Sequence, residues 1–213
     1  MTRTMPTGPT IVGALTSAIL LFTTGCSGQS DTPAPAAATQ SSPPAAAMRI
    51  DKPAKLLGTW TESVDRVIRG QAEQNMGNFK KLLAAGPTSA MGTAYVRAEE
   101  VYSRERGLHI PSDDQRGILI SAVSGTITNP TATLNKIFAG LPKVTDVGSV
   151  VPGPLGGVAG CGTGQAGTGI PVDVCVWSDQ HTIGMVTFMN FTRADDPRSV
   201  FGQIRAELER PAR

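Results

Sequence analysis

Two cysteines and an alternating stretch constrain the fold of this chain more than any other feature. Between residues 172 and 177 a valine occupies every second position, and Asp173, Cys175 and Trp177 fill the positions between them. A period of two is the signature of a β-strand. The polar residues 178–181 that follow are turn-forming, so the stretch predicts one strand and the tip of a hairpin.

The neighbouring segments predict two more strands of the same sheet. Residues 182–191 are rich in β-branched, aromatic and Met side chains, residues 155–162 form a shorter strand, and we interpret 163–169 as a flexible loop. Cys161 and Cys175 then lie on adjacent antiparallel strands, where a disulfide can form. The closed loop has fifteen residues, for which chain entropy predicts about 3 kcal/mol of stabilisation. Two reduced, buried thiols are the alternative, whereas a thioredoxin-type redox pair requires C-x-x-C.

The N-terminal segment 1–25 has the organisation of a signal peptide. It carries one basic residue, Arg3, then an apolar run over residues 11–22, then small residues up to Gly25. A run of about a dozen residues is too short for a membrane-spanning helix and is typical of a secretory signal. The sequence therefore predicts export to an oxidising compartment, which favours the disulfide.

The junction that ends in Cys26 resembles a bacterial lipobox. In that motif the cysteine receives a diacylglyceryl group and becomes the first residue of the mature protein; Thr23 stands here where the motif usually has Leu. Lipidation of Cys26 also leaves an even pair of cysteines. The resemblance implies a membrane partner, an acylated (palmitate-type) anchor and a position at the outer face of the cell membrane. Ordinary secretion with a free Cys26 is the alternative.

The remaining chain divides into a tether and one domain. Residues 26–47 are rich in Pro, Ala, Ser and Thr and lack large apolar side chains, which predicts a disordered tether. Residues 48–213 have the length of a single extracytoplasmic domain. The net charge is +2 for the whole chain, and +1 without Arg3, so there is no basic excess for binding nucleic acid.

Within the domain, three helices are predicted. Residues 62–85 place apolar side chains at spacings of three and four, although two glycines leave open a division into two shorter helices. Residues 88–102 are ambiguous, since 93–96 suit a strand and 98–106 suit a helix. We favour a strand first, before an exposed loop at 104–116. The other two helices begin at Asn129-Pro130 and Asp196-Pro197, each an N-cap followed by Pro at the first helical position.

These helices follow strands in the same way, which indicates the fold class. The apolar run 117–127 predicts a central strand before the helix at Pro130, and an additional strand is expected at 145–151. Aligning Pro130 with Pro197 superimposes the apolar positions of both helices, which indicates either a repeat or the same capping device used twice. We predict an α+β fold, an antiparallel sheet with about three helices on one face, as in ferredoxin-like or related two-layer sandwiches.

One stretch of about 35 residues resembles a known group of proteins. Upstream of the hairpin stands P-G-P-L-G-G at 152–157 and Cys161-Gly162, and the hairpin reads C-V-W-S-D-Q-H-T-I-G from Cys175 to Gly184. This pattern resembles uncharacterised membrane-anchored or lipoprotein ectodomains of high-GC Gram-positive bacteria, which share a C-x-W-x-D-x-x-[ST]-x-G hairpin with an upstream Cys-Gly. The resemblance implies location and a disulfide, and no catalytic role.

The candidate site is the hairpin-tip cluster Trp177, Asp179 and His181. An Asp-His pair can orient general-base chemistry, but Asp179 is also suited to bonding the backbone amides of its own turn. No catalytic residue, cofactor or metal site is assigned, since His109 and His181 have no ligand spacing. We expect a non-enzymatic binding or interaction domain for an unknown envelope ligand or protein; the alternative is an envelope enzyme with its site near Asp179 and His181.

Overall fold

The computed structural model describes residues 47–111, 113–167 and 169–212. The expected signal peptide at 1–25, the lipidation site Cys26 and the tether at 26–47, apart from its last residue, lie outside the described residues. Among the described residues no helix is both long and apolar enough to cross a membrane.

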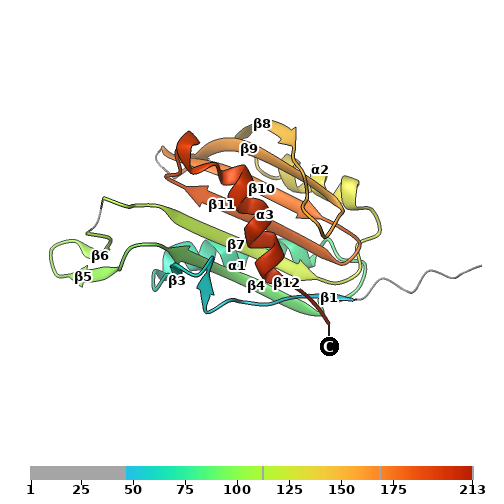
Figure 1. Ribbon diagram of the computed structural model, residues 1–213, viewed down its shortest axis with the longest axis horizontal. Helices are drawn as coiled ribbons and strands as arrows, with labels where there is room; N and C mark the ends of the chain where they lie inside the picture. The colour runs from blue at the N-terminus through green and yellow to red at the C-terminus, as the bar shows by residue number, and fades with distance from the viewer. Residues whose placement is uncertain (1–46, 112, 168, 213) are drawn as a thin grey trace, which may run out of the picture. The chain divides into compact units, whose positions relative to one another are not determined.

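The described elements are three α-helices, one short 3-10 turn and twelve strands (Figure 1). The helices are α1 (Arg66–Lys80), α2 (Pro130–Ala139) and α3 (Pro197–Leu208), and the 3-10 turn is η1 (Arg193–Asp195). The strands of the main sheet are β2 (Lys55–Leu56), β3 (Trp60–Glu62), β4 (Ser89–Val96), β7 (Gly117–Ser124), β8 (Val144–Ser149), β9 (Val158–Ala166), β10 (Ile170–Ser178) and β11 (Thr182–Met189). The remaining strands form two short pairs, β1 (Met48–Ile50) with β12 (Glu209–Pro211) and β5 (Val101–Ser103) with β6 (Gly107–His109).

The main sheet has the order β2-β3-β4-β7-β11-β10-β9-β8, and all its pairings are antiparallel. Strand β7 lies near its centre and is buried along its whole length, as the apolar run predicted. The predicted strand pair around Cys161 and Cys175 is present as β9 and β10. The antiparallel α+β fold with three helices is therefore confirmed.

Helices cover both faces of the sheet, so the prediction that they lie on one face is wrong. On one face, Phe201 and Ile204 of α3 pack with Trp177 and Phe188 of the sheet. On the other face, Phe79 of α1 and Ile137 of α2 pack with Val174 and Val176. Figure 1 accordingly shows α3 on the near side of the strands, with α1 and α2 behind them. The alternation of β10 thus buries both of its faces, because each face has its own helical cover.

The two Asx-Pro helix starts are confirmed, but they do not mark a structural repeat. The side chains of Asn129 and Asp196 accept hydrogen bonds from backbone N–H groups in the first turns of α2 and α3. The preceding strands β7 and β11 are antiparallel neighbours. A rotation that exchanges two such strands keeps their helices on one face, whereas α2 and α3 lie on opposite faces. The shared start is therefore a capping device used twice, and the ferredoxin-like arrangement is not confirmed.

Three segments differ from the sequence-based prediction. Helix α1 is one uninterrupted helix that spans 66–80 rather than 62–85. The predicted loop 104–116 contains strand β6, which pairs with β5 at the end of the ambiguous segment 88–102. The predicted loop 163–169 is strand up to residue 166, because Gly162 and Gly164 permit close approach of β8: a Cβ at Gly164 would lie 2.5 Å from a backbone oxygen. These glycines serve packing rather than flexibility.

Candidate functional site

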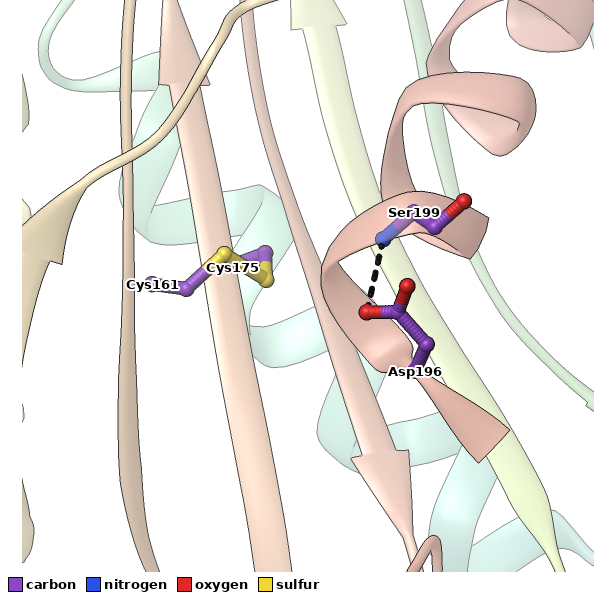
Figure 2. Close-up of a disulfide and its surroundings, with 4 residues drawn as sticks. All are labelled: Cys161, Cys175, Asp196 and Ser199. Atoms are coloured by element: carbon purple, nitrogen blue, oxygen red, sulfur yellow. Dashed lines mark hydrogen bonds between the residues drawn. A yellow bond between two sulfur atoms is a disulfide. The ribbon is translucent and has the colours of Figure 1, made fainter. Parts of the chain in front are cut away.

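The predicted disulfide joins Cys161 of β9 to Cys175 of β10. The two residues are directly opposite in the strand register, and their Cα atoms are 4.1 Å apart. Both are buried in the cluster that packs under α3, and Figure 2 shows the bond between the strands beside the first turn of that helix, where Asp196 caps Ser199. The disulfide therefore fixes the register of the strand that leads into the hairpin tip.

Asp179 builds the turn between β10 and β11. Its Oδ1 accepts hydrogen bonds from the backbone N–H groups of His181 and Thr182, at 2.6 and 2.8 Å. The backbone N–H of Asp179 donates in turn to the carbonyl of Thr182 at 3.0 Å. The carboxylate thus replaces backbone acceptors that the tight turn lacks, which is the structural role predicted for it.

Contacts of Trp177 account for the Thr and the Gly at the end of the hairpin motif, Thr182 and Gly184. Its indole is fully buried, and its Nε1–H donates to Thr182 Oγ1 at 3.1 Å. The ring lies across the opposite position of β11, Gly184, where an added Cβ would come within 1.9 Å of the ring. Its other neighbours come from α3: the ring centroid of Phe201 at 6.0 Å and the guanidinium of Arg205 at 5.7 Å. Only glycine at position 184 leaves room for the indole.

Arg205 of α3 connects the turn to the rest of the domain. Its guanidinium is buried and donates to Asp179 Oδ2 at 2.6 Å and to Glu209 Oε1 at 3.1 Å. It also donates to the carbonyl oxygens of Pro152 and Gly156, at 2.8 and 2.7 Å. A buried arginine must use its donors in this way, since unpaired donors in the interior are costly.

Glu209, the first residue of β12, completes a buried polar network. Its carboxyl group is fully buried, and Oε1 lies 2.6 Å from Thr182 Oγ1. Burial raises the pKa of Glu209, although Arg205 acts in the opposite direction. The network formed by Trp177, Asp179, Thr182, Arg205 and Glu209 is called the tip network below.

A cavity of about 450 Å³ lies beside the tip network. Its walls come from five separate segments: the start of β1, the start of α2, the loop into β9, the hairpin tip and the start of β12. The lining residues are Met48, Pro130, Thr131, Leu155, Gly157, Val158, Asp179, Gln180, His181 and Glu209. A few polar groups among apolar walls, at this volume, are typical of small-ligand sites.

The structure brings Asp179 and His181 to this cavity without forming a general-base pair. Such a pair requires the carboxylate on an imidazole nitrogen. The oxygens of Asp179 instead bond backbone N–H groups, Thr182 and Arg205. The Nε2 of His181 is buried and has no hydrogen-bond partner among the described residues.

Histidine and acidic groups do not form a metal centre in the described part of the chain: no three or more His, Cys, Asp or Glu side chains converge there. His109 lies on β6, where its Nδ1 is 3.1 Å from the carbonyl oxygen of Gly107. The two histidines therefore belong to different parts of the fold.

Sequence reasoning found the tip residues and missed Arg205 and Glu209. A signal for Arg205 does exist in the helical pattern. Phe201, Arg205 and Leu208 fall on one stripe at spacings of four and three, and the two apolar members are fully buried. A charged residue on such a stripe must have a buried partner.

Comparison of the chain with family models, curated proteins and solved structures found no match.

Proposed function

We propose that this chain is an exported, lipid-anchored binding protein of the cell envelope. In this proposal residues 1–25 direct export, Cys26 carries the acyl anchor, and the tether 26–47 holds the domain 48–213 at the outer face of the membrane. The domain binds an envelope ligand or protein and does not catalyse a reaction. The resemblance of the hairpin motif to lipoprotein ectodomains supports the same location.

The cavity beside the tip network carries the binding part of the proposal. Its volume lies within the range of small-molecule sites. The loop that forms part of its wall is held by Arg205, which donates to the carbonyl oxygens of Pro152 and Gly156. The acid that would orient a base there is already engaged, since Asp179 is bonded to the turn and to Arg205. A firm, mostly apolar cavity with its acid already paired favours binding over catalysis.

A fluorescent apolar dye tests the cavity as a binding site. Leu155 lines the cavity, and Leu155→Asp places a charge on its wall. The matched control is Val151→Asp in the same loop, because Val151 is 83% exposed and does not line the cavity. We expect the dye to bind the mature protein, with affinity reduced at least tenfold in Leu155→Asp and unchanged in Val151→Asp. Equal binding by both variants would refute the cavity as the site.

The alternative function is an envelope enzyme with its site at Asp179 and His181. The observation in its favour is that both residues line the cavity. The mature protein should show no turnover on ester, phosphate, glycoside and peptide substrates. Turnover that disappears in His181→Ala would replace the binding proposal with this alternative.

A further inference from the structure

One hydroxyl group in the tip network has more partners than it has hydrogens. Thr182 Oγ1 lies 3.1 Å from Trp177 Nε1, 2.7 Å from Asp179 Oδ2 and 2.6 Å from Glu209 Oε1. The indole nitrogen can only donate, so the hydroxyl accepts from it. The single hydroxyl hydrogen can serve only one of the two carboxyl groups. The remaining short contact needs a proton from the carboxyl group itself.

The surroundings of the two acids decide which of them carries that proton. Asp179 accepts hydrogen bonds from His181 N and Thr182 N on Oδ1, and from Arg205 on Oδ2 at 2.6 Å. Every one of these bonds stabilises an ionised carboxylate. Glu209 has longer bonds to Arg205, at 3.1 and 3.4 Å, and no exposed side-chain surface. A buried carboxyl group with weaker ionic partners is the one that stays neutral.

We propose that Glu209 is a neutral acid in the folded protein, and that its proton joins the C-terminal strand β12 to the hairpin tip through Thr182. In this arrangement Thr182 accepts from Trp177 and from Glu209 and donates to Asp179. The network then holds one cation, Arg205, and one anion, Asp179. All three bonds of the hydroxyl are satisfied, as a buried polar network requires.

Loss of this proton should lower the affinity of the cavity for its ligand. This consequence rests on the proposed function. Ionised Glu209 would face Asp179 across one hydroxyl, with two negative charges for the single cation Arg205. β1 places Ile50 opposite Glu209, and the loop 152–156 has no charged residue. The neighbouring arginines have other partners: Arg49 of β1 pairs with Asp51, and Arg210 of β12 donates to the backbone carbonyl oxygens of residues 206 and 209. Among the described residues, His181 is the one titratable group besides Asp179 and Glu209 that lines the cavity. Rising pH should therefore loosen the walls that β12 and the tip provide.

The proton is observed directly by carbon NMR of the mature protein labelled at its glutamate carboxyl groups. Glu209→Gln assigns the resonance, and it keeps a donor for Thr182 without a charge. Glu73 is the internal reference, since it is exposed on α1. We expect the Glu209 carbon to titrate at a clearly higher pH than that of Glu73. A Glu209 midpoint equal to or below that of Glu73 would overturn the proposal.

Dye binding as a function of pH tests the link to the cavity separately. The wild type should lose affinity severalfold as the pH rises through the Glu209 midpoint, and Glu209→Gln should keep one affinity over the same interval. An equal loss in both proteins overturns the link. Absence of dye binding at every pH refutes the proposed function instead, while the NMR midpoint still decides the state of Glu209.

Discussion

Gly184→Ala is the substitution for which the structure makes its sharpest prediction. The new methyl group would lie 1.9, 2.1 and 2.4 Å from three ring atoms of Trp177, where ordinary contact begins near 3.4 Å. The indole would have to shift by about 1.5 Å to reach ordinary contact. It cannot do so and keep both its hydrogen bond to Thr182 and its packing on Phe201. Overpacking and a lost buried hydrogen bond together should lower the free energy of unfolding by about 3 kcal/mol.

Urea denaturation followed by tryptophan fluorescence measures this change. The matched control is Gly70→Ala on the exposed surface of α1, where an added Cβ meets nothing within 4 Å. The control should raise the free energy of unfolding by about 0.5 to 1 kcal/mol, since Ala is the better helix former. Adding Trp177→Phe to Gly184→Ala should recover part of the loss, because the smaller ring leaves room. A Gly184→Ala protein as stable as wild type would show that the indole does not lie across position 184.

Three further predictions concern the disulfide, acid stability and the turn. Replacing both Cys161 and Cys175 by Ala should lower the free energy of unfolding by about 3 kcal/mol in urea denaturation, the value for a loop of this length. Hydrogen bonds from Arg116 hold the pKa of Asp114 below its ordinary value, so the stability they provide is present near neutral pH and is lost as pH falls through that lowered pKa. Arg116→Ala should therefore show a smaller loss of stability on acidification than wild type, by thermal unfolding at stepped pH. Asp179→Asn should lower the melting temperature measurably at neutral pH and leave Arg205 without its strongest ionic partner; an unchanged melting temperature would contradict the role of Asp179 in the turn.

The local pattern of the sequence predicts the parts of the fold that local physics determines. The alternation of 172–177 gives strand β10, and the caps Asn129 and Asp196 give the starts of two helices. The disulfide could be predicted as well, because two consecutive strands joined by a short turn pair with each other and so bring the two cysteines onto adjacent strands. Asp179 was correctly interpreted as a turn residue because its partners lie two and three positions away.

The parts that could not be predicted depend on contacts between distant segments. Helical spacing alone extends α1 back to Val64, but Val64 is 61% exposed and the chain there is already leaving β3. The placement of α3 on the opposite face from α2 depends on the path of the chain after β11. Glu209 reaches the hairpin tip across 27 positions of sequence, and the stretch around it has no turn or motif that marks it as buried.

The mass of the mature protein isolated from the membrane fraction tests export, lipidation and the disulfide together. We expect a chain that begins at an acylated Cys26, and a Cys161–Cys175 peptide pair that separates only on reduction. A Cys26→Ala variant should lack the acyl mass. Recovery of the protein from the cytoplasm, with residues 1–25 retained and both distal thiols free, would contradict it.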